Sequence, residues 1–344
     1  MKLLIKIINT LRRFFKSLGK REKKLIRLIT FLNWQTRNDI SKLDFDENKI
    51  ARKVHEFKKE SLWPKKIAAF VIFFYKKERL EYLSKICKNL ENLNTEIDLT
   101  FVVNDEAYSK RDEINKLLPQ TSSLNYNFFE PKNLLDPRLL TYSHFEVVKE
   151  KLKDKNVSHF LYLEDDISIN VDNIKYWITA RESLRNYKLI PCFLRTEVNK
   201  NDNETYLVDS IKKNSYFWQP KVFSKKNNIA LINLLDYFTP AYLYDRELME
   251  EHINGPSGSI DFGHPTHDER WNIPKMQEQG VMERASSLLA FYNVPKGFLH
   301  RNVVPINKQT KIIKKYCLIP HLSNRFTHTE VSSFGRIKVN DLFI

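Results

Sequence analysis

The stretch "HFLYLEDDISIN", residues 159–170, decides how the fold is organised. Its apolar run "FLYL" is short and typical of a buried strand, and it ends directly in the acids Glu164, Asp165 and Asp166. Three adjacent carboxylates repel one another, so a strand end that carries them normally needs a compensating cation. The stretch therefore predicts a buried strand whose end meets a cation.

Segments typical of strands and helices alternate before this stretch. Residues 67–75, "IAAFVIFFY", are β-like in their Val, Ile and Phe content, and residues 76–93 have helical periodicity. A second strand is expected at 97–105, and a helix at 140–152 leads into the acids. This alternation predicts an α/β fold with a mostly parallel central sheet flanked by helices. Ligands of such sheets bind beyond the carboxyl ends of the strands, where the acids lie.

The chain after the acids is less regular. Residues 189–197, "LIPCFLRTE", predict another strand, and polar sequence follows to about Asn228. All glycines except Gly19 follow residue 254, which predicts a loop-rich segment there. Long loops on a rigid sheet are where functional sites are built.

Composition limits the classes of partner. The chain has 344 residues, of which 42% are hydrophobic, and this is enough apolar surface for a large core. A net charge of +15 predicts attraction to nucleic acid, to an anionic membrane surface or to a phosphorylated substrate, without choosing among them. The three cysteines form neither a CxxC pair nor a disulfide framework, which favours a reducing compartment.

The scarcity of glycine excludes the usual phosphate-binding loops. Only Gly19 precedes Gly255, so neither a Walker A loop nor a GxGxxG turn can follow the first strands. A phosphorylated nucleotide would need another device, and a metal ion held by carboxylates is the obvious one. The longest apolar run, residues 67–75, is far shorter than the roughly 20 residues of a membrane-spanning helix.

The N-terminus predicts an amphipathic helix. Apolar residues from Leu4 to Leu18 recur at helical spacing, with Lys and Arg around them. Such a helix can lie in an anionic membrane surface, here at the cytoplasmic side, or pack on the body with a solvated basic face. Residues up to about 60 are expected to be a helical linker. The predicted organisation is a basic helical region, 1–60, and one catalytic domain, 61–344.

The apolar run that ends in Glu-Asp-Asp resembles the DxD element of GT-A fold glycosyltransferases, with Glu164 and Asp166 at its outer positions. The resemblance implies a GT-A-like, Rossmann-related fold and a nucleotide-sugar donor whose diphosphate is bridged to these carboxylates by Mn²⁺ or Mg²⁺. Hard divalent cations do prefer oxygen ligands. The alternative is a solvated turn or a helix start capped by carboxylates.

The same resemblance implies residues that bind the donor. The first strand and its following loop would hold base and ribose, and polar groups after the second strand would come next. An aromatic residue at a strand end is otherwise more often part of the core, and a histidine before the acids can equally be satisfied within its helix. The donor-binding candidates are Phe74, Tyr75, Arg79 with Lys76 nearby, Asn104, Asp105, His144 and Asp165.

Further roles are implied for the second half. A later acid would be the acceptor-activating base, and Glu283 is the first candidate, with Asp268 and Glu269 as its competitors. A C-terminal histidine would be a third metal ligand beside Glu164 and Asp166, and His321 is preferred to His300. An acceptor loop is expected within Phe238–Leu248, and the acceptor-binding candidates are Arg195, Glu197, Tyr242 and Tyr244.

The sequence therefore predicts a metal-dependent glycosyltransferase that moves a sugar from a nucleotide-sugar donor to a glycan or glycolipid acceptor. Cell-surface polysaccharide or lipopolysaccharide synthesis is the expected setting, with the protein peripherally attached to the inner face of a membrane. One alternative is a basic, nucleic-acid-binding, metal-dependent phosphodiesterase that uses the same acids. Another is a catalytically inactive scaffold at a membrane surface. Nucleic acid is not the expected partner, because the positive charge is most concentrated in the N-terminal helix.

Overall fold

The computed structural model describes residues 43–343, with gaps at 133, 135, 218, 236–237, 256–280 and 329–332. The predicted N-terminal helix and Asp268 lie outside the described residues. No helix within these ranges is both long enough and apolar enough to cross a membrane. The three cysteines are free thiols.

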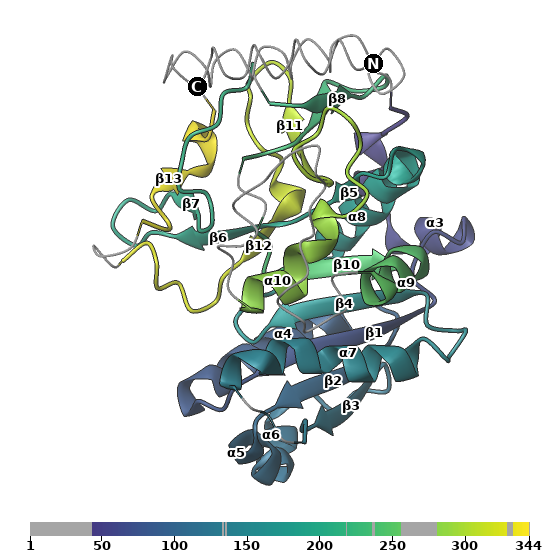
Figure 1. Cartoon of the computed structure of the whole chain (residues 1–344), viewed down its shortest axis with the longest axis vertical. Helices are drawn as coiled ribbons and strands as arrows, with labels where there is room; N and C mark the ends of the chain where they lie inside the picture. Colours follow the sequence, from purple (N-terminus) through teal and green to yellow (C-terminus); the bar gives the residue numbers. More distant parts are fainter. Residues whose placement is uncertain are drawn as a thin grey trace, which may run out of the picture.

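A five-stranded sheet forms the first half of the fold (Figure 1). Its order is β10-β4-β1-β2-β3, and four strands are parallel while β10 runs antiparallel at the edge. The predicted α/β fold with a mostly parallel central sheet is confirmed. The strands are β1 (Lys66–Phe73), β2 (Glu96–Val103), β3 (Leu124–Phe129), β4 (His159–Glu164) and β10 (Ala241–Asp245).

The order of the parallel strands creates a switch point between β1 and β4. The chain steps from β1 to β2 and β3 on one side, then returns to place β4 on the other side of β1. The strand order therefore reverses direction between β1 and β4, and at such a switch point a crevice forms outside the carboxyl ends of the two strands. Residues 67–73 of β1 are buried on both faces, as expected for a central parallel strand.

Helices cover both faces of this sheet. Phe70 of β1 faces α7 (Leu140–Lys151), where its ring centre lies 5.8 Å from that of His144. The neighbouring residues on the strands point the other way: Phe101 of β2 stacks on Tyr126 of β3, and Cys87 of α4 (Leu80–Glu91) contacts Tyr126. The short helices α5 (Asp105–Ser109) and α6 (Arg111–Leu117) follow β2.

Two smaller sheets make up the second half. One has the order β5-β11-β9-β8 and the other β12-β6-β7-β13. The strand predicted at 189–197 is divided between them at Cys192, because its two parts pair with strands from distant parts of the chain. The strands are β5 (Ile190–Pro191), β6 (Leu194–Val198), β7 (Thr205–Leu207), β8 (Lys221–Phe223), β9 (Ile229–Ile232), β11 (Asn302–Asn307), β12 (Leu318–Pro320) and β13 (Ile337–Lys338).

The remaining helices connect the sheets. Asn170 caps α8 by accepting hydrogen bonds from the amides of Asp172 and Asn173, and six residues, 165–170, separate this helix from β4. The helices are α8 (Val171–Leu184), α9 (Arg246–Asn254) and α10 (Val281–Ser287). Short 3₁₀ turns are η2 (Lys77–Arg79), η3 (Pro137–Leu139), η4 (Arg185–Tyr187), η7 (Leu288–Phe291), η8 (Lys315–Cys317) and η9 (Val339–Asp341).

The prediction of an acceptor loop within Phe238–Leu248 is wrong. Residues 241–245 are strand β10, all of whose residues are buried, and residues 246–248 begin α9. The pattern "AYLYD" alternates aromatic and aliphatic residues, as an antiparallel edge strand does when both of its faces are covered. Pairing with β4 therefore decides the conformation of this segment.

The linker predicted up to residue 60 is also wrong for residues 43–60. Phe45 and Phe57 are fully buried, and the Leu43 amide donates to the Phe223 carbonyl at 2.9 Å. The 3₁₀ turn η1 (Glu47–Ala51) packs on α8, and α3 (Val54–Lys59) follows. The apolar residues of this segment stand among many charged ones and gave too weak a pattern. Burial of Leu43, Phe45, Ile50 and Phe57 nevertheless anchors the segment, while the charged side chains stay in water.

Replacing Phe57 by Ala should therefore lower the free energy of unfolding by about 3–5 kcal/mol, because it opens a cavity in the main core. Urea denaturation of the full chain measures this. Lys59→Ala, on an exposed position of the same helix, is the matched control and should change stability by less than about 0.5 kcal/mol. Equal stability of Phe57→Ala and wild type would show that residues 43–60 are not part of the core.

Candidate functional site

A pocket of about 270 Å³ lies at the carboxyl ends of β1 and β4, at the switch point of the sheet. Phe74, directly after β1, and Leu140, at the start of α7, form part of its apolar wall. Its polar lining comes from four separate segments: Arg79, Arg138 and Thr141, Glu164 to Asp166, and Arg325.

A tight turn after β4 brings the three acids to the pocket. The Ile167 amide donates to the Glu164 carbonyl at 3.1 Å, which closes the turn. The Asp166 carbonyl accepts from the Leu322 amide at 2.7 Å, so the segment after β12 holds the turn from outside. The position of the acids therefore depends on chain more than 150 residues away.

Each acid has its own cationic partner. Arg79 Nη1 lies 2.5 Å from Asp165 Oδ1, and His321 Nε2 lies 3.0 Å from Asp166 Oδ2. Arg195 Nη1 lies 3.5 Å from Glu164 Oε2. Side chains from three other segments therefore supply the compensating charge in this structure.

Burial and these partners separate the pKa values of the acids. Burial raises the pKa of Glu164 to about 7, although Arg195 opposes the shift. Burial also raises the pKa of Asp165 to about 6, against the hydrogen bond from Arg79. For Asp166 burial acts in the same direction, but the hydrogen bond from His321 prevails and lowers its pKa to about 2. Asp166 therefore has the lowest pKa of the three acids and is fully ionised at neutral pH.

His321 links Asp166 to a second carboxylate. Its Nδ1 lies 2.5 Å from Glu197 Oε1, and the Thr327 amide donates to Glu197 Oε2 at 2.8 Å. Burial lowers the pKa of His321, but the hydrogen bonds to Asp166 and Glu197 outweigh it and raise the pKa overall. The parallel pairing of β12 with β6 sets this geometry, because the His321 amide donates to the Thr196 carbonyl.

Arg195 is fixed by a partly buried partner that the sequence analysis missed. Asp209 accepts from Arg195 Nη2 at 2.6 Å and from Nε at 3.1 Å, a bidentate pair. Phe238 and Phe326 lie on the guanidinium, each ring centre at 5.5 Å. Asp209 follows β7 in a segment taken for a polar insertion, so no sequence signal marked it.

Arg138 and Arg325 were also missed. Arg138 lies in the 3₁₀ turn η3 before α7, and its ion pair with Asp136 at 2.7 Å leaves the side chain 68% exposed. Arg325 lies four residues after His321, and this short spacing could have pointed to it. Both line the pocket beside the acids.

The donor candidates divide into two groups. Phe74, Arg79 and Asp165 line the pocket. Tyr75 and Asn104 lie next to each other, since the Tyr75 amide donates to Asn104 Oδ1 at 3.0 Å, and neither lines the pocket. Asp105, the first residue of α5, likewise does not line it.

His144, Tyr242 and Tyr244 lie in the core. His144 is fully buried, with Nε2 2.7 Å from the Tyr242 hydroxyl and Nδ1 2.5 Å from the Thr141 carbonyl. The rings of Tyr242 and Tyr244 stack at 4.2 Å, and both residues are at most 4% exposed. The structure does not bring these three side chains to the pocket, because β10 and α7 turn them toward each other.

The acid Glu283 lies on α10, which contacts α7 and η3. Its charge, with those of Glu164 and Asp165, adds to burial in raising the pKa of Tyr162. The Tyr162 hydroxyl is buried and has no hydrogen-bond partner among the described residues. His300, the alternative metal ligand, is buried and lies 3.0 Å from the Asn233 amide.

One observation on the side chains around the acids argues against a divalent cation site, and others favour it. Within the described ranges no three His, Cys, Asp or Glu side chains are grouped as metal ligands are, because each acid faces its own partner. Asp165 Oδ2, however, is buried and has no hydrogen-bond partner among the residues that the structure describes. His321 donating through Nδ1 to Glu197 is the arrangement in which a carboxylate orients a metal-binding histidine. Mg²⁺ needs only one or two carboxylates when substrate phosphates complete its shell.

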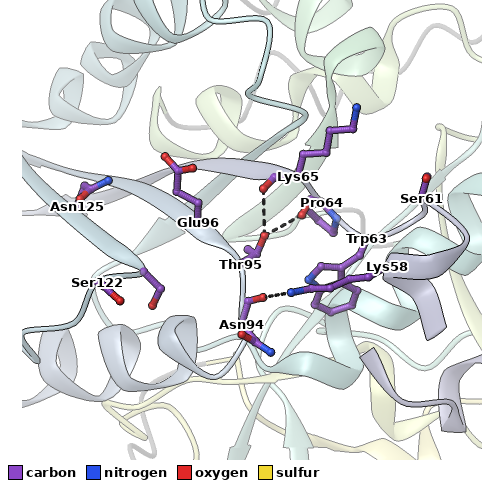
Figure 2. A pocket seen from close by; sticks show the side chains of 11 residues that line it. Lys58, Ser61, Trp63, Pro64, Lys65, Asn94, Thr95, Glu96, Ser122 and Asn125 are labelled. Carbon is purple, nitrogen blue, oxygen red and sulfur yellow. Dashed lines mark hydrogen bonds between the residues drawn. The ribbon is translucent and has the colours of Figure 1, made fainter. Parts of the chain in front are cut away.

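A larger hollow of about 800 Å³ lies at the opposite, amino-terminal edge of the sheet (Figure 2). Lys58 Nζ donates to the Asn94 carbonyl at 2.6 Å, and Thr95 Oγ1 donates to a carbonyl beside it. Its one acid, Glu96, is paired with Lys66 at 2.9 Å. Size alone does not make a site, and the smaller pocket is the candidate because perturbed acids and arginines converge there.

The chain matches no protein-family model and no curated protein. Among solved structures, it is similar to the apo structure of the bifunctional glycosyltransferase WbbM, with 10% identity and a TM-score of 0.25 over 38% of this chain and 23% of that one. It is also similar to a putative UDP-N-acetylglucosamine pyrophosphorylase from Entamoeba histolytica, with 11% identity and a TM-score of 0.36 over 62% and 66% of the chains. Each match covers less than two thirds of the similar structure's own chain. At TM-scores this low, neither similarity supports a conclusion about function.

The burial of His144 predicts how the stability of the fold depends on pH. Burial lowers its pKa from 6.5 to about 3, so the neutral ring stabilises the fold above pH 6.5 and this contribution is lost as the pH falls toward 3. Between pH 6.5 and 5 the group should account for a loss of roughly 2 kcal/mol in the free energy of unfolding. His144→Gln cannot be protonated and should lose less stability over this interval in urea denaturation.

The matched control is His55→Gln, at an exposed position of α3, which should keep the pH dependence of the wild type. The same slope in His144→Gln as in wild type would contradict a buried neutral histidine.

Proposed function

We propose that this chain is a metal-dependent glycosyltransferase that moves a sugar from a nucleotide-sugar donor to a glycan or glycolipid acceptor. The observation that carries the proposal is the pocket at the switch point, where Asp165 and Asp166 lie with three arginines. Nucleotides bind at this place in doubly wound sheets. Carboxylates for a metal and guanidinium groups for phosphates are the side chains that a nucleoside diphosphate requires.

The donor diphosphate would lie between the acids and the arginines. Arg138 and Arg325 flank the pocket, and a guanidinium fork matches the oxygens of a phosphate. Arg79 is paired with Asp165, so its charge is already held at the floor of the site. These cations would replace the glycine-rich loop that the chain lacks before Gly255.

Asp166 and His321 would hold Mn²⁺ or Mg²⁺, with Glu164 as the further predicted ligand. A bound divalent cation would neutralise the charge that develops on the departing diphosphate. Glu197 would keep the proton of His321 on Nδ1 and so leave Nε2 free to bind the ion. Arg195, held by Asp209, would fix the position of Glu164.

The acceptor would approach from the side of α10. Glu283 is the proposed base, which removes the proton from the acceptor hydroxyl as it attacks the sugar carbon. Arg195 remains the acceptor candidate beside the acids, while Glu197 is proposed here to orient His321. Cell-surface polysaccharide or lipopolysaccharide synthesis, at the inner face of a membrane, is the proposed setting.

The proposal predicts metal-dependent binding of a nucleotide. A panel of nucleoside diphosphates with Mn²⁺ should raise the melting temperature of the wild type for one nucleotide, because a ligand at a hundred times its Kd adds about 2.7 kcal/mol of stability. Asp166→Asn should lose this shift and lower turnover about a hundredfold or more.

Asp172→Asn, which removes an exposed acid from the start of α8, is the matched control and should retain the full shift. If no nucleoside diphosphate stabilises the wild type with or without metal, the chain is not a transferase of this kind.

A further inference from the structure

β8 and β11 lie at one end of the molecule (Figure 1). Two segments near these strands carry lysines and exposed apolar side chains. These are residues 211–217 and the turn 307–312. Lys311 Nζ lies 3.8 Å from the ring centre of Tyr216, so the two segments are in contact. We call this surface the basic–apolar face, and its residues are Ile211, Lys212, Lys213, Phe217, Lys308, Lys311 and Ile312.

The apolar members of this face are exposed to solvent. Phe217 is 54% exposed, Ile211 42% and Ile312 39%. Single exposed apolar residues are normal, but a group of them marks an interaction surface.

The lysines of the face are available to an external anion. None of the four forms an ion pair with an acidic side chain in the described part of the chain, whereas the nearby Lys226 and Lys314 are paired with Asp44 and Glu47 at 2.9 and 2.7 Å. The ammonium groups of Lys308 and Lys311 lie over aromatic rings, which positions them without neutralising them.

The described chain begins beside this face. The Leu43 amide donates to the Phe223 carbonyl, and Lys308 Nζ lies 6.0 Å from the ring centre of Phe223. The sequence before this point, residues 1–42, is rich in apolar and basic residues. Residues 1–42 and the basic–apolar face both carry positive charge. Because like charges repel, the two regions are better suited to binding one anionic surface than to binding each other.

We propose that the basic–apolar face binds the headgroup region of an anionic lipid membrane, with Phe217 and Ile312 entering the interface and the lysines contacting lipid phosphates. Binding to a membrane surface is stabilised both by insertion of apolar side chains and by attraction of lysines to anionic lipid. Binding to the backbone of nucleic acid is stabilised by the lysines alone. The proposal does not depend on transferase activity.

Vesicle co-sedimentation of the full chain tests this face. Wild type should bind vesicles of phosphatidylcholine mixed with phosphatidylglycerol, more weakly at high salt, and pure phosphatidylcholine much less. Each lysine near anionic lipid is worth about a fivefold change in binding, so Lys212→Ser with Lys213→Ser should weaken it about twentyfold or more. Phe217→Ser with Ile312→Ser should also weaken binding, by about tenfold.

The matched control lies at the other end of the molecule. Lys116→Ser with Leu117→Ser removes a lysine and an apolar side chain that is 54% exposed on α6, and its binding should stay within about twofold of wild type. The melting temperature of each variant, and its shift with nucleotide and Mn²⁺, should equal those of wild type, which separates this test from that of the proposed function.

Wild-type affinity in both face variants, or no vesicle binding by the wild type, would overturn the proposal. A second result would also overturn it: the lysine variant loses binding to both vesicles and duplex DNA, whereas Phe217→Ser with Ile312→Ser binds both as wild type does. That result would assign the face to nucleic acid.

Discussion

The neutralisation of three adjacent carboxylates at the end of β4 is the interaction on which the rest of the structure depends. Glu164, Asp165 and Asp166 are held at the edge of a buried sheet, where unpaired charge is expensive. Their partners come from the segment after β1, from β6 and from the end of β12. The main sheet and the sheet of β6 and β12 must therefore lie against each other at this edge.

The second half of the chain serves this edge. Parallel pairing of β12 with β6 puts His321 beside Glu197, and the turn after β4 is tied to Leu322. Arg195 reaches Glu164 only because Asp209 and two aromatic rings hold its guanidinium. A site built in this way is sensitive to changes far from the pocket, since each acid is positioned by chain that is remote in sequence.

The strong periodic segments were predicted correctly, and the weak ones were not. The strands at 67–75, 97–105 and the acids, and the helices between them, formed within a few residues of the expected limits. The segment at 43–60 and the strand β10 were missed because their conformation comes from distant partners: Phe57 from the core and residues 241–245 from β4. The pattern of residues along a segment indicates its own preference for helix or strand, and pairing with a remote part of the chain overrides that preference.

The sequence by itself determined the parallel sheet, the position of the acids at the end of a buried strand and the absence of a glycine-rich phosphate loop before Gly255. The resemblance of its acids to a DxD element also singled out His321 and Arg79 as candidates. Only the tertiary structure decided which cation meets which acid, that Asp209 and Arg325 belong to the site, and that Tyr242 and His144 belong to the core. The physical reason is that charge pairing and burial depend on distances across sheets, and a single sequence does not encode those distances position by position.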